Sequence, residues 1–187
     1  ALAAVLALTI LSGCSQTEYI YNTIVTPAAE PDPMTRYYVQ VINEEYDKLS
    51  DDTKKRIVAF ASAELDQKAK EAAELINKGV NQREAVREVV KNSLKEGEVA
   101  LCGEEDLTFL TPTSKIREMF TDCRSVGPLE EGQKVGALNW NRYTAFTVGT
   151  AVYRDKSNKP YRLMLVVAHS RYCLLYTSPS PRDRSVS

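Results

Sequence analysis

The stretch that decides the fold reads RYTAFTVGTAVY over residues 142–153 and continues as YRLMLVVAH over residues 161–169. Both segments are rich in β-branched and aromatic residues, a composition typical of strands. The intervening DKSNKP of residues 155–160 has the polar residues and the proline that are typical of a turn. The pattern predicts a β-hairpin with a loop of several residues. Because an isolated hairpin is only marginally stable, this one must pack against other elements.

Upstream of the hairpin, apolar residues recur at steps of three and four, which is helical spacing. Ser50 and Asn81 are placed to cap helices, and Gly79 stands where a helix commonly ends. These signals predict three helices, over residues 34–49, 50–78 and 81–97. A short fourth helix is expected after residues 111–114. The expected fold class is therefore α+β: an N-terminal helical layer, a short helix and an antiparallel sheet of at least two strands.

The composition is that of an ordinary globular protein. The chain has 187 residues, enough for one domain with its own core. Apolar residues make up 43% and charged residues 26%, which is too polar for a protein that spans a membrane several times. The net charge is −1, so no strong positive field is available to attract nucleic acid. We therefore expect no nucleic-acid partner.

The N-terminus carries an export signature. Residues 1–11 read ALAAVLALTIL, an uncharged apolar run shorter than the roughly 20 residues of a membrane-spanning helix. The residues Leu11-Ser12-Gly13-Cys14 follow. This segment resembles the signal peptide and lipobox of bacterial lipoproteins, and the resemblance covers residues 1–14 only. It implies cleavage between Gly13 and Cys14 and a diacylglycerol thioether on Cys14. Because Ser15 replaces the aspartate of inner-membrane retention signals, the resemblance also favours the outer membrane, facing the periplasm.

Four segments are expected along the chain. Residues 1–13 form the signal peptide, and residues 14–33 form a lipidated tether containing three prolines. Residues 34–172 form a single α+β domain. Residues 173–183 resemble the translation of a transposase adapter used in preparing sequencing libraries, so residues 173–187 are expected to be a non-native tail. On this reading the domain is C-terminally truncated.

The cysteines divide by position. Cys14 is the lipidation site, and Cys173 belongs to the adapter-like tail. Cys102 and Cys123 remain as an even pair in an exported chain, where an oxidising compartment favours a disulfide. Two buried free thiols are the alternative, because spacing does not fix the geometry of a bridge. Zinc binding is not expected from two cysteines without a nearby histidine.

No catalytic motif stands out. The single histidine, His169, ends a predicted strand, and no G-x-S-x-G elbow or phosphate-binding loop is present. Glu104, Glu105 and Asp106 form an acidic run with the groups to bind a cation or act as acid and base, but such runs are usually solvated turns. Trp140, Tyr143 and Phe146 are explained by core packing more simply than by an aromatic binding surface. We expect no catalytic residues, cofactor or metal.

Three functions remain open from the sequence. The first is a lipid-anchored envelope protein with a non-catalytic binding or structural role toward an envelope protein, peptidoglycan or the membrane. The second is a phage lysis or exclusion lipoprotein, because the lipobox and proline-containing tether resemble small outer-membrane spanins. The third is an envelope hydrolase whose catalytic residues lie beyond the truncated end.

Overall fold

The computed structural model describes residues 29–48, 57–109, 112–127, 132–138 and 142–170. Five strands form one mixed sheet in the order β1-β4-β5-β2-β3. β1 runs parallel to β4, and the other neighbouring pairs are antiparallel. The strands are β1 (Val58–Ala61), β2 (Val99–Asp106), β3 (Arg124–Ser125), β4 (Tyr143–Arg154) and β5 (Pro160–Ser170).

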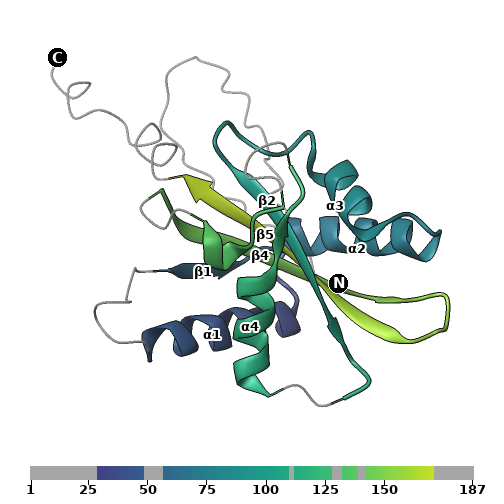
Figure 1. Cartoon of the computed structure of the whole chain (residues 1–187), viewed down its shortest axis with the longest axis horizontal. Helices are drawn as coiled ribbons and strands as arrows, with labels where there is room; N and C mark the ends of the chain where they lie inside the picture. The colour runs from purple at the N-terminus through teal and green to yellow at the C-terminus, as the bar shows by residue number, and fades with distance from the viewer. Residues whose placement is uncertain (1–28, 49–56, 110–111, 128–131, 139–141, 171–187) are drawn as a thin grey trace, which may run out of the picture.

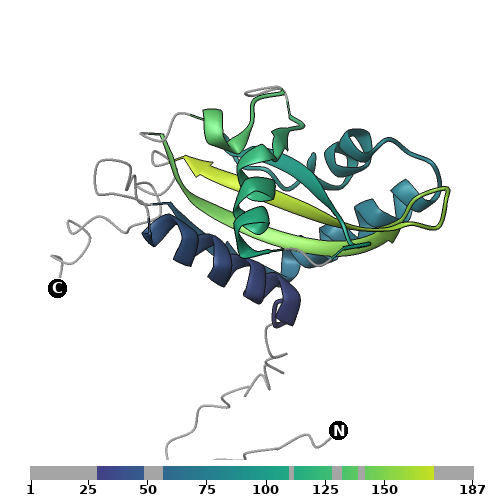
Figure 2. The same ribbon diagram turned by 60° about the horizontal axis from the view of Figure 1, so that its bottom comes forward.

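The helices pack on both faces of this sheet. They are α1 (Pro33–Asp47), α2 (Ala63–Asn77), α3 (Gln82–Val90), α4 (Thr113–Asp122) and the one-turn 3₁₀ helix η1 (Val135–Ala137). α1 and α4 contact each other on one face, and in Figure 2 α1 lies below the strands while α4 crosses in front of them. α2 and α3 contact each other and share a core with the opposite face.

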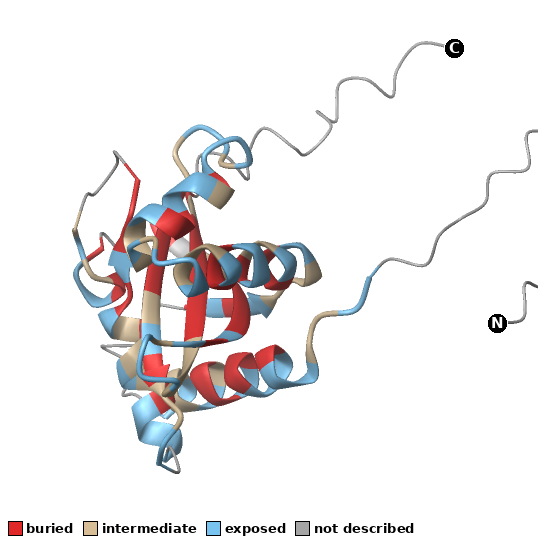
Figure 3. Ribbon diagram, turned by 90° about the vertical axis from the view of Figure 1, so that its right-hand side faces the viewer, coloured by how far each residue is buried: buried red, intermediate tan, exposed pale blue. Residues whose placement is uncertain are grey.

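Two apolar clusters follow from this layering. Alternation along each strand sends odd and even residues to opposite faces, so that Met164 and Val166 join the α1/α4-side cluster while Leu163 and Leu165 join the α2/α3-side cluster. Figure 3 shows buried residues running along the strands and along the helix faces that meet them. β5 is therefore buried on both faces, which explains its nearly continuous apolar sequence.

The predicted hairpin is confirmed as β4 and β5, whose turn reaches beyond the helices at the right of Figure 1. Asp155 organises this turn by accepting hydrogen bonds from the backbone N–H groups of Ser157 (2.8 Å) and Lys159 (2.8 Å). Asn158 adopts a φ of 62°, a left-handed conformation that asparagine tolerates better than most residues. The turn chemistry read from the sequence thus operates as expected.

α2 lies against the sheet at the one position where β4 has no side chain. Ser62 caps the helix by accepting a hydrogen bond from the N–H of Leu65 (3.2 Å). A Cβ built on Gly149 would lie 2.5 Å from both the N atom of Asp66 and the O atom of Leu65. Gly149 therefore permits a contact between helix and strand backbones that any other residue would prevent.

The α+β class is confirmed, but the arrangement differs from the sequence prediction in four ways. The predicted second helix is wrong over residues 58–61, which form β1, and the helix begins only after Ser62. Its proposed cap, Ser50, lies outside the described residues. The helices occupy both faces of the sheet instead of one layer, and the parallel β1 makes the sheet mixed, not antiparallel. α3 ends at Val90 instead of near Gly97.

Candidate functional site

His169 lies at the end of β5 with a hydrogen-bonding partner on each side. The register pairs Ala145 of β4 with His169, which brings the neighbouring Thr147 side chain onto the same face. On the other side Val99 pairs with Ala168, so that Glu98, just before β2, comes opposite His169. Three strands therefore bring together residues that are 22 and 71 positions from His169 in the sequence.

These residues, which we call the His169 cluster, form a linear chain of hydrogen bonds. His169 Nδ1 lies 2.9 Å from Glu98 Oε1, and His169 Nε2 lies 2.5 Å from Thr147 Oγ1. A carboxylate can only accept, so Nδ1 carries the proton in this contact. In the neutral imidazole, Nε2 is then the acceptor for the hydroxyl proton of Thr147.

The cluster is held firmly at its acidic end and is open at the other. The side chain of Glu98 is 9% exposed, and its second oxygen accepts a hydrogen bond from the N–H of Lys95 (2.9 Å). The side chain of His169 is 25% exposed, and Thr147 is half-buried. The Glu98 carboxylate therefore orients the imidazole through Nδ1, while the Nε2 edge beside the Thr147 hydroxyl remains accessible.

A small polar pocket of about 290 Å³ lies over the cluster. Its lining includes all three cluster residues, together with Ser93, Leu94 and Lys95 from the segment after α3. Ser62, Glu64 and Leu65, at the start of α2, form another wall. The amino end of a helix favours negative charge because its first N–H groups have no acceptor within the helix. The pocket thus combines a hydroxyl, an imidazole and the amino end of a helix with the carboxylates of Glu64 and Glu98.

A second pocket, of about 520 Å³, is apolar and lies beside the first. Val90, Leu94, Val99 and Val126 supply apolar lining, and Leu94, Lys95 and Glu98 line both pockets. Cationic side chains border the apolar pocket, namely Arg87, Lys91 and Lys95. Arg87 Nε donates a 2.7 Å hydrogen bond to the carbonyl of Val126, which fixes one wall. This is the combination of apolar lining and few polar groups that small-molecule sites usually show.

A larger hollow of about 930 Å³ lies between residues 29–36 and the first turns of α2. Its lining consists mainly of charged and proline side chains, including Glu30, Arg36, Lys68 and Glu71. No convergent set of reactive groups faces it. The two pockets around residues 94–98 are therefore the stronger candidates for a functional site.

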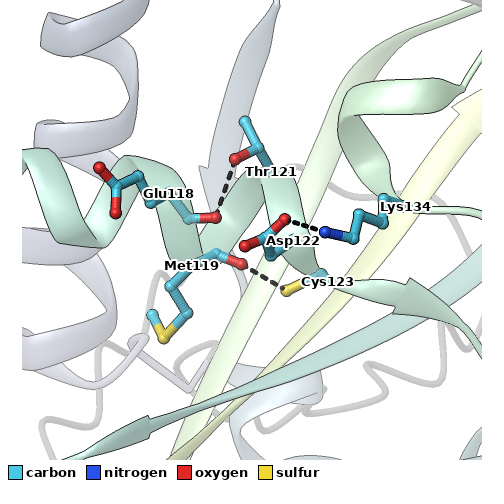
Figure 4. A network of polar contacts seen from close by, with 6 residues as sticks. All are labelled: Glu118, Met119, Thr121, Asp122, Cys123 and Lys134. Atoms are coloured by element: carbon cyan, nitrogen blue, oxygen red, sulfur yellow. Dashed lines mark hydrogen bonds and ion pairs between the residues drawn. The ribbon is translucent and has the colours of Figure 1, made fainter.

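The structure places Cys102 and Cys123 as free, buried thiols in different core clusters. Cys102 points toward α2 and α3, whereas Cys123 lies on the α1/α4 side, where its Sγ sits over Gly103. Figure 4 shows Cys123 Sγ directed at the carbonyl of Met119, 3.4 Å away. The disulfide is not formed in this structure, and it stays a prediction that thiol counting with and without reductant can decide.

Burial also governs the chemistry of both thiols. It raises the pKa of Cys102 to about 12 and that of Cys123 well above its ordinary value. Both groups are therefore protonated near neutral pH, and thiols in this state are poor nucleophiles. Neither cysteine lines the two pockets described above.

The acidic run is not a turn, because all three residues lie on β2 and divide between its two faces. Glu104 accepts a hydrogen bond from the hydroxyl of Tyr153, and Glu105 accepts one from Tyr38. Asp106 pairs with Lys159 at 2.5 Å. Burial, and then the bond to the carboxylate, raise the pKa of each tyrosine above its ordinary value. Within the described ranges, no group of three or more His, Cys, Asp or Glu side chains is placed to hold a metal ion.

The remaining sequence candidates fall partly outside the described residues. Gly13, Cys14 and Trp140 belong to segments that the structure does not describe. Tyr143 and Phe146 are buried in the α1/α4-side cluster, and the Phe146 ring packs edge-on against Phe120 with centroids 5.4 Å apart. These two aromatic residues serve core packing, as the sequence suggested.

None of the described helices is both long and apolar enough to cross a membrane. Comparison with protein-family models, with curated protein sequences and with solved structures found no match to this chain.

Proposed function

We propose that this chain is a lipid-anchored protein of the bacterial envelope whose folded domain binds the apolar chain of a membrane component. The anchor rests on the lipobox resemblance at Cys14, and the tether of residues 14–33 holds the domain away from the bilayer. The observation that carries the binding role is the apolar pocket of about 520 Å³.

The lining of the apolar pocket indicates the class of ligand. Val90, Val99 and Val126 form the buried apolar floor of this pocket, and the half-buried Leu94 supplies apolar surface at its mouth. Burying a methylene group against such surface contributes about 0.8 kcal/mol. Arg87, Lys91 and Lys95 make the border polar; Lys91 is paired with Glu88 at 2.5 Å, and Glu98 is held by His169. An acyl chain ending in an anionic or strongly polar head group fits this distribution.

Anchoring is tested by metabolic labelling. Cells that express the full chain in a bacterial host are fed a clickable fatty acid, and membrane and soluble fractions are compared with those of Cys14→Ser. We expect label and membrane association for the natural chain, and loss of both for the variant. An unlabelled protein, or a Cys14→Ser variant that still sediments with membranes, would contradict the anchor.

Binding is tested with octanoate, a soluble single-chain carboxylate, by titration calorimetry on the full chain in lipid nanodiscs, with empty nanodiscs subtracted. We expect saturable binding that Leu94→Asp weakens at least tenfold, because the variant places a charge in the apolar pocket. Val152→Asp is the matched control, since Val152 is 50% exposed on β4 and lines neither of the two pockets. Equal affinity for both variants would contradict the assignment.

A further inference from the structure

The apolar pocket does not account for the His169 cluster beside it. The cluster places a hydroxyl, an imidazole and a carboxylate in series, with distances of 2.5 Å and 2.9 Å between them. An imidazole that merely linked two strands would not need a hydroxyl partner at the side facing a pocket. The geometry matches the general requirement for an activated nucleophile, in which a base contacts the nucleophile and a third group orients the base.

We propose that Thr147, His169 and Glu98 form a hydrolytic site for carboxylic esters. Thr147 is the nucleophile, His169 is the general base and acid, and Glu98 is the positioning residue. This proposal reverses the sequence expectation of a non-catalytic domain, which rested on the absence of any recognisable partner for His169. It also places the reaction inside the described domain instead of beyond its C-terminal end.

The reaction proceeds in two balanced steps. In the first, Thr147 Oγ1 attacks the ester carbonyl while its proton passes to His169 Nε2. The carbon–oxygen bond to the leaving alcohol then breaks, and the alcohol departs with the proton that His169 holds. The product is an ester between the acyl group and Thr147.

In the second step a water molecule attacks this acyl ester and gives its proton to His169 Nε2. The bond between the acyl carbon and Thr147 Oγ1 breaks, and the proton returns to the threonine oxygen. The carboxylic acid leaves, and the site is restored without an oxidant, a reductant or a metal. Throughout, the Glu98 carboxylate accepts the hydrogen bond from His169 Nδ1–H and stabilises the positive charge on the imidazole.

In this proposal the amino end of α2 acts through its dipole, since the N–H of Leu65 is already bonded to Ser62 Oγ. Negative charge develops on the carbonyl oxygen in both steps, and the dipole at a helix start stabilises it. Ser62, Glu64 and Leu65 bring this end of α2 to the wall of the polar pocket. Gly149 is what allows the helix start to approach β4 so closely, two residues from Thr147.

The substrate class follows from the neighbouring pocket, and this step rests on the proposed binding function. Leu94, Lys95 and Glu98 line both pockets, so an acyl chain in the apolar pocket would bring its ester group toward the His169 cluster. The expected substrates are therefore esters of medium or long acyl chains. A short ester such as an acetate makes no use of the apolar pocket and tests the cluster alone.

The experiment uses the full chain in lipid nanodiscs with p-nitrophenyl acetate and p-nitrophenyl octanoate. Thr147→Val, which replaces the hydroxyl with a methyl group of similar size, and His169→Gln are each expected to lower kcat/KM for both esters at least roughly 100-fold. Thr147→Ser keeps a hydroxyl and should retain activity. Glu98→Gln should lower kcat with little change in KM, because it acts through the imidazole. Thr121→Val on α4 is the matched control and should behave as the natural chain.

A second measurement identifies the nucleophile directly. After reaction with a fluorophosphonate probe, peptide mass mapping should find the adduct on Thr147, and it should be absent in His169→Gln. Unchanged turnover in Thr147→Val, or no adduct on Thr147, would overturn the proposal even if a variant folds poorly. Because Leu94 lines both pockets, Leu94→Asp separates the two proposals only through the acetate control: loss of the preference for octanoate with acetate hydrolysis retained concerns the apolar pocket, and loss of acetate hydrolysis in Thr147→Val concerns the cluster.

Discussion

Asp66 and Glu98 are both largely buried carboxylates near the start of α2, yet their hydrogen-bonding partners differ. Asp66 is 3% exposed and accepts hydrogen bonds from Thr35 Oγ1 (2.6 Å), the N–H of Thr150 (2.8 Å) and the N–H of Asp32 (2.7 Å). The donors of this Asp66 cluster lie at the start of α1 and on β4, so Asp66 ties both elements to α2. Glu98 also accepts a backbone bond, but its other partner, His169, faces a pocket.

The difference separates a structural network from a reactive one. In the Asp66 cluster the Thr150 hydroxyl lies 2.8 Å from that of Thr35 and accepts a 3.4 Å hydrogen bond from Arg162 Nη1, so the network is fully bonded within the protein and joins α1, α2, β4 and β5. In the His169 cluster the last group, the Thr147 hydroxyl, has the pocket beside it. Closed networks contribute to stability, whereas open ones can change partners when a ligand arrives. Substitutions in the two clusters should therefore affect different measurements.

The largest effect is expected at Gly149, which lies between the two clusters. In Gly149→Ala the new methyl would lie 2.2 Å from the carbonyl carbon of Leu65 and 2.5 Å from the N atom of Asp66, so the helix start must move. Because both clusters depend on that helix start, we expect a loss of about 4 kcal/mol of unfolding free energy, above the usual range for an overpacked core. Urea unfolding followed by circular dichroism measures it.

Gly127→Ala is the matched control for this change, because a Cβ at Gly127 would meet nothing within 4 Å. We expect its unfolding free energy to stay within about 0.5 kcal/mol of the natural value. Equal stability of both alanine variants would show that α2 does not lie against β4 as described.

The next effect in size is expected for Asp66→Ala. The substitution leaves the N–H of Thr150 and the hydroxyl of Thr35 without their acceptor in a buried position, which costs about 3 kcal/mol. Glu71→Ala changes an exposed carboxylate on the same helix and should cost less than about 0.5 kcal/mol. A loss of less than about 1 kcal/mol of unfolding free energy for Asp66→Ala would mean that the Asp66 cluster does not hold α1 against α2.

A smaller effect on stability is expected for His169→Gln. The imidazole is 25% exposed and its contacts are replaceable by water, so the unfolding free energy should fall by at most about 1 kcal/mol. A small stability loss together with loss of ester hydrolysis would show that the His169 cluster serves catalysis and the Asp66 cluster serves stability. A loss above about 2 kcal/mol would instead place His169 with Asp66 among the structural residues.

The sequence predicted those elements whose signals are local. The alternation and turn residues of 142–169 gave the hairpin, and Asn81 does cap α3 by accepting from the N–H of Arg83 (3.0 Å). The segment around Val58–Ala61 has helical spacing but forms a strand, because β4 offers it an unpaired edge from Ala145 to Val148. Such tertiary pairing is invisible in the sequence and overrides local preference.

The candidate site escaped prediction for a related reason. His169 was the only histidine, but its partners come from strands whose register the sequence does not state. Once β2 is known to pair with β5, counting from Val99 and Ala168 leads directly to Glu98. The missed signal was thus a further strand at residues 99–106. Its last three residues are acidic, and for that reason the sequence alone indicated a turn there.

The smallest effect on stability is expected for Asp106, a carboxylate near the surface that belongs to neither cluster. The pKa of Asp106 is lowered to about 2, chiefly by the bond from the Lys159 ammonium and also by bonds from Thr108. An aspartate with a depressed folded-state pKa stabilises the fold above its unfolded pKa, near 4, and this contribution is lost as the pH falls toward 2. Asp106→Asn should therefore be slightly less stable than the natural chain at pH 5, and the difference should vanish near pH 2. Unfolding curves between pH 2 and 5 test this, with Asp47→Asn at the exposed end of α1 as the control. A stability difference that persists at pH 2 would show that Asp106 acts through its shape and not through its charge.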